Sequence, residues 1–175
     1  MSTKSVCDIK KFALLVDIGI ITVPDEYDHA SRLTTFGKQN CKKFYYYDDN
    51  ITDKNFPNPT RILMPGDKLR VRAFQQVVGG TTTSEERMAL LTIQKAIHTG
   101  AQGASIIFDQ KRYQLPKDKW YASFDEPDRL WKYADSGHGM SRLHRHSGGD
   151  FEFDISHFER VWSGVNAFLC FCDIE

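Results

Sequence analysis

The sequence predicts an α+β fold in a single domain, built from a mixed sheet of about five strands, a central helix and an N-terminal helical hairpin. Three observations carry this prediction. Residues 66–109 show a strand pattern, a helix pattern and a second strand pattern in succession. Helical spacing dominates the first 40 residues, and further alternating or apolar runs follow residue 110. The length of 175 residues makes one domain the default, although residues 1–40 could form a helical subdomain.

The N-terminal 40 residues are expected to form two helices. Apolar residues recur at helical spacing in residues 8–17, and a second helix is expected from Pro24 to about Phe36, because proline suits a first helical turn. Two helices around a turn are also typical of a DNA-binding helix-turn-helix. The second helix opens with Asp25 and Glu26, and such carboxylates would repel phosphates. Helical-hairpin packing is therefore preferred.

The centre of the chain predicts a strand, a helix and a second strand. Residues 68–78 alternate between apolar and polar, as in a half-buried strand. Thr83 and Glu86 have the spacing of a capping box, so a helix is expected to begin there and to end at Gly100. Residues 104–109 are apolar on both faces, as an interior strand requires. If the two strands lie parallel in one sheet, the helix is the crossover between them and should be right-handed.

The rest of the sequence supplies further strands and two long loops. Aromatic or alternating runs predict strands, and stretches rich in Asn, Asp, Pro or Gly predict loops. A short helix capped by Asp125 is also expected. The predicted strands are residues 42–49, 120–124, 151–155 and 167–174, and the predicted loops are residues 50–60 and 134–150.

Charge and cysteine content limit the classes of partner. The 23 basic residues balance the 23 acidic ones, which argues against nucleic acid as a partner. No run approaches the length of a membrane span, and the start of the chain lacks the apolar core of a signal peptide. The four cysteines are too scattered for a disulfide framework, and Cys170 and Cys172 are expected on opposite faces of a strand. These observations predict a cytoplasmic protein with no membrane partner.

A cluster of histidines offers the best candidate site. His138, His144 and His146 lie within nine residues of one another, with Arg142 between them and Asp150 after them. His144, His146 and Asp150 could hold a divalent metal, because imidazole and carboxylate are common ligands. Without a metal, His138, His144 or His146 could act as a general acid or base while Arg142 holds a phosphate. A solvated or partner-contacting loop is the alternative.

The C-terminal half of the chain resembles a family of uncharacterised small bacterial proteins. The resemblance covers residues 100–173 and is carried by the stretch GAQG, by LP, KWY, SFDE and LW within residues 115–131, by GGDFEF, and by the closing FLCFCD. It implies a bacterial or bacteriophage source and a cytoplasmic setting. It implies no function and no site residue.

Two hypotheses of different class follow for the function. The first is a non-catalytic module that binds another protein, in keeping with neutral charge and abundant aromatic residues. The second is a hydrolase or nuclease that uses residues 138–150, with metal assistance as an option and no other cofactor indicated. The second hypothesis requires at least two of the polar side chains in this segment to meet in one pocket, whereas the first leaves them in solvent.

Overall fold

The structure, a computed structural model, describes residues 9–174, which form one eight-stranded sheet and three α-helices. The α+β class is therefore confirmed, with eight strands rather than about five. The strands are β1 (Phe12–Thr22), β2 (Phe44–Tyr47), β3 (Lys68–Gln76), β4 (Lys119–Ser123), β5 (Trp131–Lys132), β6 (His138–Arg145), β7 (Phe151–His157) and β8 (Asn166–Asp173). The helices are α1 (Arg32–Asn40), α2 (Ser84–Ile93) and α3 (Gly100–Lys111).

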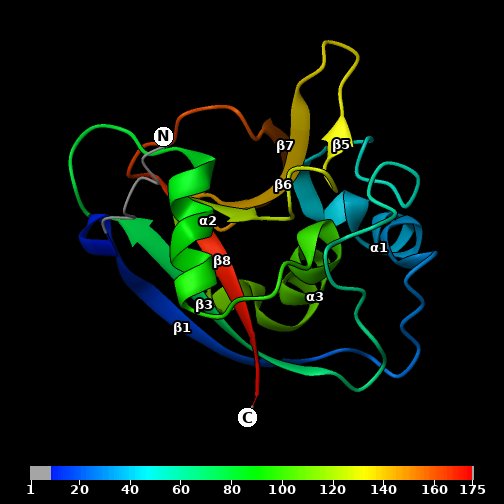
Figure 1. The fold of residues 1–175 in the computed structure, drawn as a ribbon. Coiled ribbons are helices and arrows are strands. Elements are labelled where there is room, and N and C mark those ends of the chain that lie inside the picture. The colour runs from blue at the N-terminus through cyan, green and yellow to red at the C-terminus, as the bar shows by residue number, and fades with distance from the viewer. Residues whose placement is uncertain (1–8, 175) are drawn as a thin grey trace.

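The sheet is mixed and is not built in chain order. Its strands follow the order β1, β3, β8, β4, β6, β7, β2. The short strand β5 pairs with the N-terminal end of β6. The pairs β8–β4 and β7–β2 are parallel, and the other pairs are antiparallel. The C-terminal strand β8 thus lies between β3 and β4, in the interior of the sheet (Figure 1). The prediction that this apolar strand is interior is confirmed.

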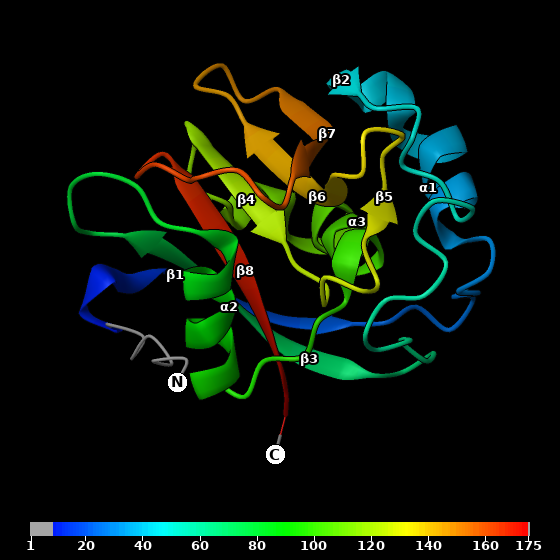
Figure 2. The ribbon, with the colours of Figure 1, turned by 45° about the horizontal axis from the view of Figure 1, so that its top comes forward.

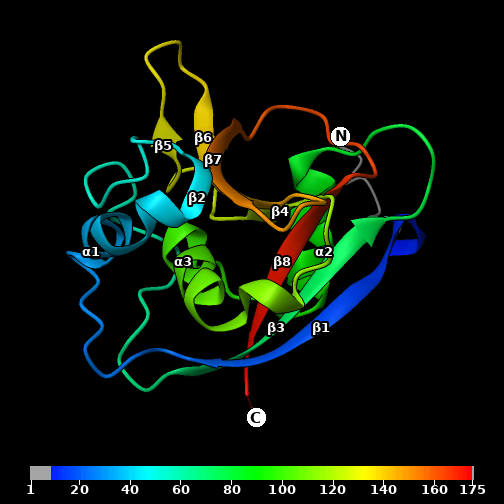
Figure 3. The same cartoon turned by 180° about the vertical axis from the view of Figure 1, so that it is seen from behind.

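Helices cover the two faces of the sheet unequally. Figures 1 and 3 show α2 on one side of β8, and α3 with α1 on the other. The cluster around α3 is the larger core, and it includes side chains from β1, β3, β6, β7 and β8. The cluster under α2 draws on β3, β4 and β8, and its only β6 residue is Met140. Seen from the side, α2 lies over β8 and β3 and away from β7 (Figure 2). The α2 side of β6 and β7 is therefore left to polar side chains.

The predicted N-terminal helical hairpin is wrong. Residues 12–22 form β1, an edge strand antiparallel to β3, and the first α-helix, α1, does not begin until Arg32. Two register shifts interrupt β1, between Leu14 and Val16 and between Asp17 and Gly19. Such bulges add a residue and change which face the next side chain occupies, so the apolar spacing imitates a helix. Through β1, residues 12–22 belong to the main sheet.

The predicted interior strand at residues 104–109 is also wrong. These residues lie in α3, whose members from Gly100 to Phe108 are all buried. A helix that is covered on all sides is apolar all round, and periodicity cannot distinguish it from a buried strand. The expected parallel crossover does not exist. Gly100 begins α3 instead of ending α2, which stops earlier, at Ile93.

The long loop expected at residues 134–150 contains an eight-residue strand. β6 covers His138–Arg145 and pairs with β7 through a short turn. Its polar residues include Arg142 and His144 on one face, while Leu143 is buried on the other. Because the segment is rich in glycine and polar residues, the alternation of buried and exposed side chains along β6 is not evident in the sequence. The short helix expected at Asp125 is absent from the described chain, where turns lead into β5 instead.

Several local predictions are confirmed. Strands overlap the predicted ones at β2, β3, β4, β7 and β8. The capping box is present: Glu86 N donates to Thr83 Oγ1 at 3.2 Å, and Thr83 N donates to Glu86 Oε2 at 2.8 Å. Among residues 9–174 there is no helix with the length and apolar character needed to cross a membrane.

Candidate metal centre

The candidate site lies on the part of the sheet that α2 leaves uncovered. Leu143 and Phe153 point into the core around α3. Because side chains alternate along a strand, His144 of β6 and Glu152 of β7 point to the opposite face. The two residues are directly paired across the β6–β7 ladder. Cross-strand partners of this kind have side chains close enough to share a ligand.

His146 completes a group of three ligating side chains. It follows β6, and its Nε2 lies 2.9 Å from Glu152 Oε1. The rings of His144 and His146 have centroids 4.1 Å apart. One ligand atom from each of His144, His146 and Glu152 lies within 4.8 Å of the other two. The fold therefore brings together two imidazoles and a carboxylate from one hairpin.

The turn between β6 and β7 sets the position of His146. Its amide donates to the carbonyl of Asp150 at 2.8 Å, and the amide of Gly149 donates back to the carbonyl of His146 at 2.9 Å. Gly149 has a φ of 99°, a conformation that favours glycine. The sequence HSGGD thus closes the hairpin tightly, which fixes His146 beside Glu152.

His144 is held by an aromatic neighbour and retains an unused ring nitrogen. Its ring stacks on Trp120 of β4, with centroids 4.4 Å apart and an interplanar angle of 10°. Its Nδ1 is buried and has no hydrogen-bond partner in the described structure. Burial lowers the pKa of His144, and the neighbouring His146 lowers it further. A neutral imidazole with a free nitrogen is the form that binds a metal.

Arg142 supports the site and does not face it as a free cation. Its Nη2 and Nε donate to Asp154 Oδ2 at 2.6 and 3.1 Å. Its guanidinium also lies 3.7 Å from the centroid of the Trp120 ring. Arg142 therefore fixes the indole on which His144 stacks. The phosphate-holding role considered for Arg142 would require breaking this half-buried ion pair.

His138 and Asp150 do not join the group. His138 is at the opposite end of β6, six residues from His144, which corresponds to about 20 Å of extended strand. Its Nδ1 contacts the carboxylate of Glu159. Asp150 lines an open cavity of about 290 Å³ with Tyr45 and His146, but its carboxylate lies outside the cluster of ligand atoms. The carboxylate that the structure brings to the histidines belongs to Glu152.

Sequence reasoning missed Glu152 because it missed β6. The alternation of residues 151–155 already places Glu152 on the wet face of a strand. Pairing that strand with a second one across the HSGGD turn would have put Glu152 opposite His144. The assignment of residues 134–150 to a loop removed this partner.

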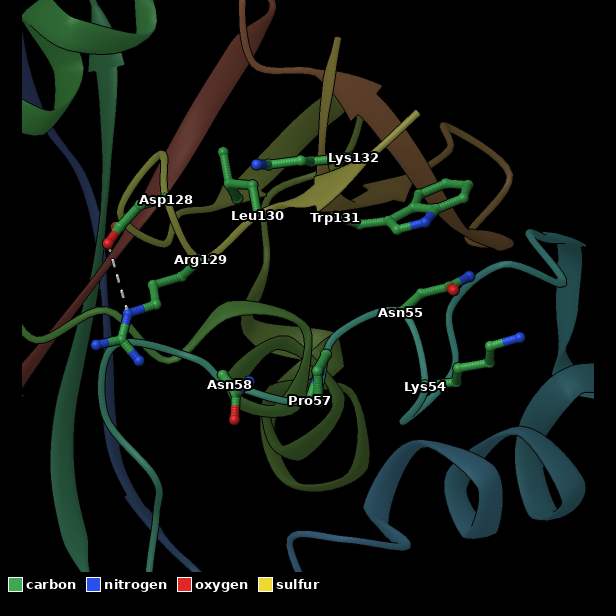
Figure 4. A pocket seen from close by; sticks show the side chains of 9 residues that line it. All are labelled: Lys54, Asn55, Pro57, Asn58, Asp128, Arg129, Leu130, Trp131 and Lys132. Atoms are coloured by element: carbon green, nitrogen blue, oxygen red, sulfur yellow. Dashed lines mark ion pairs between the residues drawn. The ribbon is translucent and has the colours of Figure 1, made fainter. Parts of the chain in front are cut away.

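A second cavity, of about 460 Å³, lies between the segment that follows β2 and residues 128–132, which include β5. Figure 4 shows its lining, in which Lys54, Arg129 and Lys132 extend in different directions. Arg129 is 3.9 Å from the carboxylate of its neighbour Asp128. The lining side chains do not converge on one point, so this cavity is a weaker candidate than the cluster of His144, His146 and Glu152.

The chain was compared with models of protein families, with curated proteins and with solved structures, and none of them matches.

Proposed function

We propose that this protein binds a divalent transition-metal ion through His144, His146 and Glu152, and that the bound ion serves hydrolysis of an ester. The observation that carries the proposal is the convergence of these three side chains within 4.8 Å, with His144 Nδ1 buried and unpartnered. Atoms bound to one tetrahedral zinc ion at roughly 2.1 Å lie about 3.4 Å apart. Small rotations of the side chains would close the group to that distance.

Three protein ligands leave one tetrahedral position open, as in catalytic rather than structural zinc sites. An ion there would lower the pKa of a bound water to roughly 7, which would supply a nucleophile at neutral pH. A divalent ion bound by two neutral imidazoles and the carboxylate of Glu152 would leave the site with about one net positive charge. This charge favours an anionic substrate such as a phosphate ester. The open cavity beside His146 and Tyr45 gives room for it.

The first test is calorimetric titration of the metal-stripped full chain with Zn²⁺ and Mn²⁺. His144→Ala, His146→Ala and Glu152→Gln should each weaken binding by roughly tenfold or more, because each removes a ligand. The matched controls are His138→Ala on the same strand and Asp150→Ala in the adjoining turn, and both should bind like wild type. Binding should weaken as pH falls below 6.5, through the lowered pKa of His144, because a protonated imidazole cannot bind the ion.

Equal loss in Asp150→Ala and Glu152→Gln would contradict the assignment of ligands, and absence of binding to the wild-type chain would contradict the site itself. Hydrolysis is tested separately with bis(p-nitrophenyl) phosphate. Turnover should require the metal and should be lost in Glu152→Gln. If the protein binds the metal but does not turn over phosphate or carboxylate esters, the proposed metal site would stand and the proposed hydrolase activity would be contradicted.

A second candidate function is protein binding by strand addition, and the edge strand β1 favours it. Within the described residues β1 pairs on one side only, with β3, and its Leu14 and Ile20 are each about half exposed. An unpaired edge offers backbone donors and acceptors to an extended segment of another chain. A partner retained by wild type should be lost with Leu14→Lys or Ile20→Lys. It should still bind the control Val161→Lys, which alters an exposed residue that is not part of β1.

Two features of the chain support a reducing, cytoplasmic location as part of this proposal. The described cysteines, Cys41, Cys170 and Cys172, are all free. Two of them lie near enough to each other to oxidise readily outside a reducing compartment.

A further inference from the structure

The end of β8 carries two thiols side by side. Cys170 and Cys172 are two residues apart in a strand, so they share a face, and the expectation that they point to opposite faces is wrong. Their sulfur atoms are 3.7 Å apart. Cys170 is fully buried, whereas Cys172 is partly exposed beneath the C-terminal end of α2. The thiol of Cys172 is therefore partly accessible to solvent, whereas the neighbouring thiol of Cys170 is buried.

A cation faces the accessible thiol. Arg72, on the neighbouring strand β3, places Nη2 3.5 Å from Cys172 Sγ. Its Nε is buried without a hydrogen-bond partner. Asp17, opposite Arg72 on β1, forms its ion pair with Arg70, although the charge of Arg72 also acts on it. The other groups against Cys172 are the carbonyl of Gln94, at 3.4 Å, and the carboxylate of Asp173. A guanidinium in this position stabilises a thiolate.

The two thiols titrate as a pair with opposite tendencies. The hydrogen bond from Cys170 lowers the pKa of Cys172, and the hydrogen bond and charge of Arg72 act in the same direction against burial and Asp173. The same contact and burial raise the pKa of Cys170. The arrangement separates one nucleophilic sulfur from one thiol that stays protonated.

We infer that Cys170 and Cys172 form a redox-active dithiol that reacts with hydroperoxides, with Cys172 as the attacking sulfur and Cys170 as the resolving thiol. The Cys172 thiolate attacks the outer peroxide oxygen, so that an S–O bond forms and the O–O bond breaks. The leaving alkoxide or hydroxide takes up a proton. The Cys170 thiol then attacks the sulfenic sulfur of Cys172, which forms the disulfide and releases water.

The position in the strand makes this disulfide reversible. In an extended strand, the Cα atoms of residues two apart are separated by about 6.6 Å, near the upper limit for a disulfide. Closing the bond requires β8 to bend. β4 pairs with β8 only at Asn166, Ala167 and Phe168. The end of the strand that carries the thiols is therefore held by β3 on one side and, on the other, by a single bridge in which the amide of Ile97 donates to the carbonyl of Phe171 at 2.8 Å. A strained and partly exposed disulfide is readily reduced.

The experiment uses the full chain with Cys7→Ser and Cys41→Ser, so that only the pair remains. Limiting hydrogen peroxide should remove both thiols with the loss of two hydrogens in the intact mass, and dithiothreitol should restore them. Adding Cys170→Ser should leave a sulfenic acid on Cys172 that dimedone traps. Adding Cys172→Ser should leave a chain that does not react, because Cys170 is fully buried.

Arg72→Gln should slow alkylation of Cys172 at neutral pH roughly tenfold, because the thiolate fraction falls. The matched control is Arg70→Gln on the same strand, where the guanidinium is bound to Asp17 instead. Wild-type protein gives a measurement that needs no substitution: Cys172 should be alkylated before Cys41 and Cys170. Cys172 that reacts no faster than Cys41 overturns the proposal, and a sulfenic acid that persists beside an intact Cys170 overturns the resolving role.

Discussion

A single buried carboxylate shows how tertiary packing changes the chemistry of a residue. Asp125 is 4% exposed, and its Oδ1 accepts a hydrogen bond of 2.6 Å from the amide of Thr60. Burial raises the pKa of Asp125 to about 7, although the bonds from Thr60 act against the shift. In the sequence, Asp125 is predicted only as the cap of a short helix, beside Glu126 and Asp128, and nothing there indicates a raised pKa.

The raised pKa of Asp125 predicts a pH-dependent stability. Between 3.8, its ordinary pKa, and about 7, the folded protein holds a proton on Asp125 that the unfolded chain releases. Stability therefore falls as pH rises through this window. The shift of about three units corresponds to roughly 4 kcal/mol.

Urea unfolding of wild type and Asp125→Asn at a series of pH values tests this expectation. The stability of wild type relative to the variant should decrease from about pH 4 to about pH 8. The control Asp128→Asn changes an exposed carboxylate and should show no such trend. A constant difference between wild type and Asp125→Asn would mean that Asp125 is ionised throughout.

At the scale of elements, the start of α3 depends on a glycine. Gly100 has a φ of 55°, and a Cβ atom added there would lie 2.2 Å from Asp125 Oδ2. The residue satisfies two demands at once, a left-handed backbone and close contact with the segment after β4. From the sequence alone the same glycine suited the end of the preceding helix equally well.

Gly100→Ala should therefore destabilise the protein by roughly 2–4 kcal/mol, from backbone strain and from displacement of Asp125. Chemical denaturation measures the loss. Gly148→Ala is the matched control, because φ at Gly148 is not in the left-handed region and an added Cβ would meet only Asp150 Oδ2, at 3.8 Å. Similar losses at the two positions would show that Gly100 is not under special constraint.

At the scale of the whole molecule, stability should be graded across the sheet. β3 and β8 lie between other strands and contribute side chains to both cores. β1 and β2 lie at the two ends of the sheet order, and β2 has only four residues. Buried, doubly paired strands open least often in the native state.

Native-state hydrogen exchange should show this gradient. Amides of Phe168 and Leu169 should exchange slowest, and those of β2 should exchange orders of magnitude faster. Protection of β2 equal to that of β8 would mean that the sheet opens only as one cooperative unit. A saturating metal ion should raise protection in β6 and β7 if the proposed site is correct, because binding stabilises the folded hairpin.

The candidate site was only partly predictable. His144 and His146 could be identified as candidate ligands from residue type and spacing, but Asp150 was preferred to Glu152. Distance along the chain favoured Asp150, whereas cross-strand pairing with His144 favours Glu152. The role of Trp120 and the ion pair of Arg142 with Asp154 come from separate strands, and local sequence carries no sign of either.

By itself the sequence determined the mixed α+β class, the capping box of α2 and the strands whose alternation or apolar run is unbroken, such as β3 and β8. These features depend on contacts between near neighbours in the chain. Only the tertiary structure decided that residues 12–22 form a bulged edge strand, that residues 100–111 form a buried helix and that β6 pairs with β7. The reason is physical: burial on all sides and register shifts remove the periodicity that reports local structure, so pairing and packing with distant residues select the conformation. The three ligands and the two thiols likewise acquire their chemistry from neighbours that the fold, and not the chain order, brings to them.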